Sequence, residues 1–366
     1  MIINKKICVV VPAYNEEQQI TKVIRNMPEF VDRIVIVDDN SIDGTNKAVQ
    51  SIILSNEYPK HVSEKPEGNT VENSMYGEAD RILVSLDKKE LQKLPESVIF
   101  NESPEIDRVI LIKLNKNSGN GKAIARGLKW AKDNNMDIIA VMDGDGQMDP
   151  GELIKIINPI IKEEADYVKG NRFMHKSSWY LIPKIRFIGN SILSILTKIA
   201  SGYWKISDTQ TGYIAMSKKA VNMINLHEIY RSFGWPNDLL VKMNMANIRL
   251  KEVEIKPVYN IGEKSKMKLY KIIPRISFLL LFSFTKRLWI KYFFKDFHPL
   301  FLLYNFSVFL FLLDSKYIYK IIYAFINQVQ LNFEPILAFL FLTISAFQSL
   351  LFAMWMDIQD NERLYV

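Results

Sequence analysis

Short apolar runs alternate with amphipathic stretches along the first 150 residues of this 366-residue chain. Four runs are almost wholly aliphatic and too short for helices, so they predict buried strands: 7–11, 34–37, 109–114 and 138–142. Between them, apolar residues recur at helical spacing, as in 20–27 and 124–131. Strands that are apolar on both faces and joined by helices predict an α/β fold with a mainly parallel, covered sheet.

Acidic side chains stand directly after two of these predicted strands. Asp38 and Asp39 follow the second run, and Asp143 follows the fourth, with Asp145 two residues later. Ligands of parallel sheets bind beyond the carboxyl ends of the strands. The pattern therefore predicts a binding site at that edge of the sheet.

Residues 55–107 do not follow the alternation of strand-like and helix-like segments. They are polar, contain four prolines and hold one strand-like run at 82–86. We interpret them as an insertion, which either covers the site or forms a partly disordered surface loop.

The C-terminal part of the chain is apolar. Residues 336–356 carry no charge and would span about 30 Å as a helix, enough to cross a bilayer core. The sequence thus predicts a soluble domain at 1–270, juxtamembrane interfacial helices at 271–297, and a transmembrane region at 298–366 with spans at about 299–325 and 335–356. A buried soluble hairpin is the alternative for 299–325.

The net charge of +7 changes this picture in one respect. Much of the basic excess lies between residues 264 and 295, just before the apolar stretches, and includes Arg287 and Lys291. This placement suits an anionic membrane surface and, by the positive-inside rule, predicts a multi-pass protein with its soluble domain in the cytoplasm. The basic residues are not interleaved with stacking aromatics, which disfavours nucleic acid. A single cysteine, Cys8, excludes a disulfide framework.

Residues 141–147 are the most informative segment for chemistry. Asp143 and Asp145 can both face one divalent ion, and Mg²⁺ takes oxygen ligands together with substrate phosphates. Such an ion neutralises the charge that develops on a leaving nucleoside diphosphate. The segment predicts Mg²⁺ or Mn²⁺ as cofactor; a solvated turn is the alternative.

Two further turns carry candidate ligand contacts. In residues 37–45, the carboxylates of Asp38 and Asp39 can accept hydrogen bonds from a base edge or ribose, while Ser41 or Asp43 caps a helix. Residues 115–122 resemble a phosphate-cradling loop that opens a helix. Its Lys122 is either a diphosphate contact or a solvated lysine.

Together these motifs resemble a known family. The segments 11–16, 38–45, 117–122 and 143–147 occur in the order seen in family 2 glycosyltransferases of the GT-A (nucleotide-diphospho-sugar transferase) fold. Segments 170–172, 208–213 and 262–266 resemble its polyprenyl-phosphate branch, whose best-known member is dolichyl-phosphate mannose synthase. The resemblance covers nearly all of 5–270 apart from the insertion. It implies inverting, metal-dependent transfer of a hexose from a GDP- or UDP-linked donor to a polyprenyl or dolichyl phosphate at the cytoplasmic membrane face.

The resemblance also implies residue roles. The nucleotide-sugar would be held by Pro12, Tyr14, Glu16, Asp38, Asp39, Lys122 and Asp143. The metal would be held by Asp143, Asp145 and Gln147. The acceptor phosphate would meet Arg172, Arg186, Asn190, Lys264 and Lys266, and the catalytic group would comprise Asp145, Asp208, Arg172 and Asp238.

Asn237-Asp238 departs from the Glu-Asp pair of many relatives. A sugar hydroxyl acceptor needs a general base. A phosphate monoester is already mostly anionic at pH 7 and instead needs cationic side chains that bind and align it. The departure therefore favours a lipid-phosphate acceptor. Asp238 is either a base or a residue that caps and orients the helix following it.

Two other functions remain as hypotheses. A processive polysaccharide synthase would carry a Gln-x-x-Arg-Trp motif, whereas Arg231 and Trp235 stand here without the Gln and at another spacing. A non-catalytic membrane protein that binds nucleotide-sugars is the third reading. The sugar, the nucleobase, the exact lipid, the metal preference and the oligomeric state, including a homo-oligomer, stay open.

Overall fold

The computed structural model describes residues 5–55, 77–182, 184–258, 269–330 and 332–366. Lys264 and Lys266 and residues 56–76 of the insertion lie outside this described part. The side chain of Arg186 is likewise outside it, although its backbone belongs to a helix.

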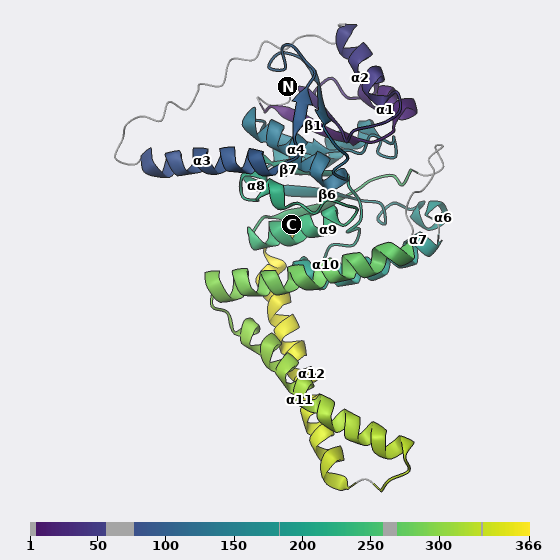
Figure 1. The fold of residues 1–366 in the computed structure, drawn as a ribbon, viewed down its shortest axis with the longest axis vertical. Coiled ribbons are helices and arrows are strands. Elements are labelled where there is room, and N and C mark those ends of the chain that lie inside the picture. Colours follow the sequence, from purple (N-terminus) through teal and green to yellow (C-terminus); the bar gives the residue numbers. More distant parts are fainter. Residues whose placement is uncertain (1–4, 56–76, 183, 259–268, 331) are drawn as a thin grey trace.

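The centre of the molecule is an eight-stranded, mainly parallel sheet in the order β3-β4-β2-β1-β5-β7-β6-β8 (Figure 1). The four predicted strands are confirmed as β1, β2, β4 and β5, which lie side by side and all parallel in the second to fifth positions of the sheet. Strands β7 and β3 run antiparallel to their neighbours. The strand bounds are β1 Ile7–Ala13, β2 Arg33–Asp38, β3 Ser97–Ile99, β4 Val109–Leu114, β5 Ile138–Val141, β6 Tyr167–Asn171, β7 Ile214–Ser217 and β8 Leu250–Glu254.

Helices cover both faces of this sheet, because successive side chains of a strand point to opposite faces. On one face, Val9 and Val11 of β1 pack with α1 (Glu17–Arg25), α2 (Thr45–Leu54) and α5 (Leu153–Ile161). On the other, Cys8 and Val10 pack with α4 (Asn120–Asp133), α8 (Lys218–Asn222) and α9 (Trp235–Met245). The α/β sandwich therefore orients the carboxyl ends of β1, β2, β4 and β5 toward one edge.

The insertion does not form the strand expected at 82–86. These residues lie inside a helix, α3 (Gly77–Lys93), which is followed by the short edge strand β3. A short apolar run is compatible with either a strand or a helix. Here the polar residues on both sides of the run belong to the same helix. The described part of the insertion packs beside α4, where Lys132 reaches Asp87 and Glu90.

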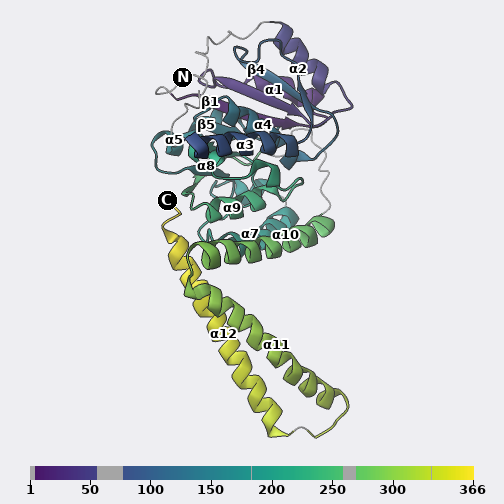
Figure 2. The ribbon, with the colours of Figure 1, turned by 60° about the vertical axis from the view of Figure 1, so that its left-hand side comes forward.

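Below the sheet, two helices run side by side and a hairpin extends away from them (Figures 1 and 2). The paired helices are α7 (Lys184–Ser201) and α10 (Leu269–Trp289), and α10 continues into a π-helical turn at Ile290–Lys295. The hairpin consists of α11 (Pro299–Ile326, 28 residues) and α12 (Phe333–Glu362, 30 residues). Both are long and apolar enough to cross a membrane, and most of their surface is exposed, unlike that of a buried soluble hairpin.

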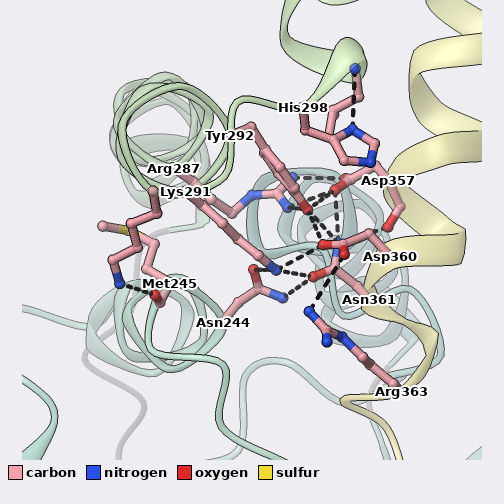
Figure 3. A network of polar contacts seen from close by, with 12 residues as sticks. Asn244, Met245, Arg287, Lys291, Tyr292, His298, Asp357, Asp360, Asn361 and Arg363 are labelled. Carbon is pink, nitrogen blue, oxygen red and sulfur yellow. Dashed lines mark hydrogen bonds and ion pairs between the residues drawn. The ribbon is translucent and has the colours of Figure 1, made fainter.

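Two of the basic residues expected at the membrane surface are buried instead. Arg287 is fully buried and makes a bidentate ion pair with Asp357 of α12, with both N–O distances at 2.8 Å. Lys291 donates to Asn361 of α12 at 2.6 Å and to Asn244 of α9 at 3.2 Å (Figure 3). These cations therefore join the hairpin to the α/β domain, and they cannot meet lipid headgroups as predicted.

Candidate active site

A cleft of about 820 Å³ opens at the predicted edge of the sheet. It is bordered by the turns that follow β1, β2, β4 and β5 and, on the opposite side, by β6, α7 and α9. Nine of the predicted site residues line it: Pro12, Tyr14, Glu16, Asp39, Asp143, Asp145, Gln147, Arg172 and Asn190. Four others, Asp38, Lys122, Asp208 and Asp238, are absent from its lining.

Asp143 and Asp145 form the acidic part of the cleft. Burial and then the neighbouring Asp145 carboxylate raise the pKa of Asp143 to about 7, whereas Asn120 and Arg172 act in the opposite direction. The Nδ2 of Asn120 approaches Oδ1 of Asp143 at 3.4 Å. Because Arg172 acts electrostatically on Asp143, the acidic and basic parts of the site share one space.

This pair of carboxylates fits a divalent cation. Two like charges in a desolvated position repel each other, and a bound cation would relieve that repulsion. No group of three or more His, Cys, Asp and Glu side chains in the described ranges is arranged to hold a metal ion. An ion on Asp143 and Asp145 would thus complete its coordination with the Gln147 amide, water and phosphate oxygens.

The turn after β1 is tied to the turn after β2. Asn15 adopts a left-handed conformation (φ 58°), donates its N–H to Ser41 Oγ at 3.0 Å and accepts from Ile42 N–H at 3.0 Å. The N–H of Glu16 donates to Thr45 Oγ1 at 2.8 Å. These bonds fix Tyr14 and Glu16, which line the cleft on either side of Asn15.

Asp38 and Asp39 differ in their surroundings. Asp38 is fully buried, and its Oδ1 accepts the N–H of Ser41 at 2.9 Å, so it shapes the turn. Asp39 lines the cleft and accepts the N–H groups of Ser118 and Gly119 at 2.6 and 2.8 Å. Burial raises the pKa of Asp39, although these two hydrogen bonds oppose the effect.

In the loop at 115–122, three backbone amides are hydrogen-bonded to other parts of the protein. Its amides at 118 and 119 are bonded to Asp39, and that of Gly121 donates to the Arg231 carbonyl at 3.1 Å. A Cβ on Gly121 would lie 1.9 Å from the Tyr230 carbonyl oxygen, so glycine is required by close packing. Lys122 donates to the His227 carbonyl and lines a second, separate cavity of about 470 Å³.

On the basic side, Arg172 is held by a buried carboxylate. Its Nε and Nη2 donate to Asp208 at 2.7 and 2.9 Å, and its backbone N–H donates to the same carboxylate at 3.1 Å. Burial by itself would raise the pKa of Asp208, but the charge and hydrogen bonds of Arg172, together with the charge of Lys169, outweigh it and lower that pKa. Asp208 therefore lies behind Arg172 and orients it, while Asn190 of α7 lines the cleft nearby.

The side chains of Asp238 and Asn237 are both hydrogen-bonded to neighbouring groups of the protein. Asp238 accepts the Tyr230 N–H at 2.9 Å and pairs with Lys242, which corresponds to the orienting alternative. The buried Asn237 accepts from Gln210 Nε2 at 2.9 Å. Gln210 itself lines the cleft.

Two functional candidates escaped the sequence reasoning. Lys169 of β6 is fully buried and donates to the Thr211 carbonyl, and burial lowers its pKa to about 7. Glu252 of β8 is also buried and accepts the N–H groups of Ser207 and Asp208 at 3.0 and 3.1 Å. For Lys169 the available signal was a charged residue inside an otherwise buried strand, whereas β8 alternates buried and partly exposed positions and gave no such signal for Glu252.

The amino-acid sequence matches Glycosyl transferase family 2 over residues 8–76 and 89–224, which together make up more than half of the chain. The chain belongs to this family. It is a glycosyltransferase, and the expected family and α/β fold class are confirmed.

Individual relatives of the glycosyltransferase act on dolichyl phosphate according to their names. UDP-N-acetylglucosamine--dolichyl-phosphate N-acetylglucosaminyltransferase from Methanococcus voltae is 29% identical over 258 residues, 70% of this chain and 87% of the relative. A dolichyl-phosphate beta-glucosyltransferase from Trichomonas vaginalis is 23% identical over 76% of this chain and 73% of its own. Among solved structures, glucosyl-3-phosphoglycerate synthase from Mycobacterium tuberculosis is similar with a TM-score of 0.46 and 15% identity, covering 78% of this chain and 80% of that one.

Proposed function

We propose that this glycosyltransferase moves a hexose from a GDP- or UDP-linked donor to a polyprenyl or dolichyl phosphate, with inversion at the anomeric carbon. The observation that carries the proposal is the shared cleft, which is lined by Asp143 and Asp145 on one side and by Arg172 on the other. The names of the two dolichyl-phosphate glycosyltransferases among its relatives support the acceptor.

The acidic side would bind the leaving group. Asp143, Asp145 and Gln147 would hold Mg²⁺ or Mn²⁺, which when bound neutralises the charge developing on the nucleoside diphosphate. The base and ribose would lie against Pro12, Tyr14, Glu16 and Asp39, which line the same cleft. Asp38 and Lys122 would act indirectly, by shaping the turn and the loop around that position.

The basic side would bind the acceptor. One phosphate oxygen forms a bond to the anomeric carbon while the bond from that carbon to the nucleoside diphosphate breaks. The phosphate is already anionic at pH 7, so no residue has to remove a proton from it. Arg172, Asn190 and, outside the described side chains, Arg186, Lys264 and Lys266 would collect and align this anion. Asp208 would hold Arg172, and Asp238 would orient α9.

The acceptor's hydrocarbon chain requires a membrane beside the cleft. The hairpin exposes many large apolar side chains, and so do α7 and α10, which contribute to the cleft lining, and α6 (Ser178–Leu181), which precedes α7. Those on the three helices include Trp179, Tyr180, Ile188, Ile192, Phe278 and Phe282. We propose that the hairpin spans the bilayer twice, that α10 lies at its surface, and that the α/β domain is cytoplasmic.

A transfer assay tests the proposal. Purified full-length protein with Mg²⁺ or Mn²⁺ is given labelled UDP-glucose, UDP-N-acetylglucosamine or GDP-mannose together with a short polyprenyl phosphate, and the organic phase is counted. One donor should give a labelled lipid, and chelation of the metal should abolish it. Asp145→Asn and Arg172→Ala should each reduce transfer by about a hundredfold or more. Glu163→Gln, at an exposed acid paired with Lys5, serves as the matched control.

Three results would contradict the proposal. Transfer that survives both site variants would mean that the cleft is not the reaction site. A water-soluble polymer would indicate a processive polysaccharide synthase. Tight donor binding without nucleotide release in the presence of lipid phosphate would indicate a non-catalytic binding protein.

A further inference from the structure

A buried carboxylate lies beneath the segment that holds Arg172. Glu252 stands in the middle of β8, with Lys169 of β6 as its partner in the parallel register. Both side chains are buried, although each carries an ionisable group. None of the described residues that line the cleft belongs to β8, so Glu252 can act on a substrate only through other residues.

Four donors from the described residues meet the Glu252 carboxylate. Its Oε2 accepts the N–H and the hydroxyl of Ser207 at 3.0 and 3.2 Å and the Nδ2 of Asn171 at 3.0 Å. Its Oε1 accepts the N–H of Asp208 at 3.1 Å. An ionised carboxylate only accepts hydrogen bonds and offers about four lone-pair sites, so it suits this set of donors. A glutamine in the same place would turn an NH₂ group toward at least one of them.

These donors belong to the two segments that support Arg172. Asn171 is the last residue of β6 and directly precedes the arginine. Asp208 accepts from the Arg172 guanidinium at 2.7 and 2.9 Å and from its backbone N–H at 3.1 Å. Glu252 therefore binds both the residue before the arginine and the residue that pairs with it.

Lys169, the register partner of Glu252, supports the same segment. Its ammonium group donates to the carbonyl of Thr211, three residues after Asp208. The charges of Lys169 and Arg172 act on Asp208, and the charge of Glu252 acts on Lys169. Glu252 thus belongs to one buried group of opposite charges, and a neutral residue in its place would disturb the balance of that group.

We propose that Glu252 is a positioning residue for the transfer reaction, which holds the guanidinium of Arg172 toward the acceptor phosphate by binding Asn171 and Asp208. The donor would lie against the turns that follow β1, β2 and β5, on the other side of the cleft. A shift of Arg172 should therefore weaken acceptor binding more than donor binding. This inference rests on the proposed function, and it concerns a residue outside the cleft.

The test compares Glu252→Gln with a matched control on the same strand, Glu254→Gln. Glu254 is the last residue of β8 and is exposed. For Glu252→Gln, the KM for a short polyprenyl phosphate should rise about tenfold, as expected when a hydrogen bond to a charged group is lost. The KM for the nucleotide-sugar should change less than about twofold, and Glu254→Gln should leave both values unchanged.

Ser207→Ala provides a milder change at the same contact. It removes the hydroxyl that donates to Glu252 and accepts from Asn171, while the N–H of residue 207 stays in place. The acceptor KM should rise in the same direction, by about two- to threefold. Thermal unfolding in detergent shows whether each variant is folded, and Ser207→Ala decides the question if Glu252→Gln does not fold.

A double-mutant comparison tests whether the effect is transmitted through Arg172. Binding of the short polyprenyl phosphate is measured without donor in an Arg172→Lys background. There Glu252→Gln should weaken binding little further, because both changes disturb the same contact. If the two effects on the dissociation constant multiply instead, Glu252 acts independently of Arg172 and the proposal is wrong.

The outcomes also distinguish this inference from the proposed function. Wild-type protein that neither binds nor glycosylates polyprenyl phosphate would refute the proposed function. Active wild-type protein whose folded Glu252→Gln variant keeps its acceptor KM, or loses donor and acceptor affinity equally, would refute the positioning role of Glu252 alone.

Discussion

Several charged residues are buried directly beneath the basic side of the cleft. Asp208 and Lys169 have no exposed surface, and Glu252 is buried as well. Isolated buried charges are strongly unfavourable, so each of these groups must be paired or hydrogen-bonded. At the scale of single residues, this requirement helps to hold Arg172 in one orientation, because the charge of Asp208 is stabilised by that guanidinium together with neighbouring amides and the charge of Lys169.

Lys169 makes the stability of the protein depend on pH. Burial lowers the pKa of Lys169 to about 7 despite the opposing charges of Asp208 and Glu252, while the unfolded chain keeps the ordinary value of 10.5. Between these values the unfolded state binds more protons than the folded state. The shifted pKa of Lys169 therefore destabilises the fold most at about pH 7 and below, and this penalty shrinks as the pH rises toward 10.5, so the free energy of unfolding increases with pH in this window.

Denaturant unfolding in detergent at pH 7, 8 and 9 checks this expectation. The free energy of unfolding of the wild type, relative to Lys169→Met, should increase with pH across the three conditions. A constant difference between the two proteins would show that Lys169 titrates normally in the folded state.

At the scale of elements, α10 and the π-helical turn have a composition typical of an interfacial helix, with cations among apolar residues. Their place in the fold divides these cations into two kinds. Lys286 remains exposed and pairs with Glu228 at 2.9 Å, whereas Arg287 and Lys291 are covered by α12. Whether a cation is buried or exposed depends on which face of the helix packs against α12. That packing is a tertiary contact.

The Arg287–Asp357 pair should be essential for stability. Asp357→Ala would leave the Arg287 guanidinium buried without its carboxylate, which typically costs about 3–5 kcal/mol. Asp360→Ala, at a partly exposed partner of Lys291, is the matched comparison and should cost clearly less. Unfolding of the two variants in detergent measures the difference, and equal losses would show that burial of the ion pair is not decisive.

At the scale of the whole molecule, the hairpin and the α/β domain are not independent. The C-terminal turns of α12 pair with α9 and α10, and the residues after α12 pair with Leu250 of β8, so the chain leaves the α/β domain at α10 and returns to it after α12 (Figure 2). An anchor that served only for attachment would need no such return.

Removal of the hairpin should therefore damage the α/β domain. A chain ending at residue 298 lacks Asp357 and Asn361, which leaves Arg287 and Lys291 without these partners, and it also lacks the backbone pairing of Leu364 and Val366 with Leu250. We expect its thermal unfolding to occur several degrees below that of the full chain, since about 1 kcal/mol shifts the midpoint by 2–4 °C at this size. The truncated chain carrying Arg287→Met and Lys291→Met should recover part of the loss. An unchanged midpoint would show that the hairpin contributes nothing to the domain.

The amino-acid sequence by itself determined the four parallel strands, the edge of the sheet at which the cleft opens and two long apolar helices. These features follow from local periodicity and from the rule that ligands meet the carboxyl ends of parallel strands. The same local patterns could not distinguish helix from strand at 82–86, where a short apolar run fits both.

Only the tertiary structure decided which candidates share the cleft. Asp39 and Asp143 line it, whereas Asp38, next to Asp39 in the chain, and Asp208 lie behind the residues that do. The burial of Arg287 was also decided only by the tertiary structure. Its partner Asp357 lies 70 positions away in the chain, so no local pattern could reveal the pair. The physical reason is common to both findings: a side chain's role depends on desolvation and on partners distant in sequence, and neither is encoded in the residues beside it.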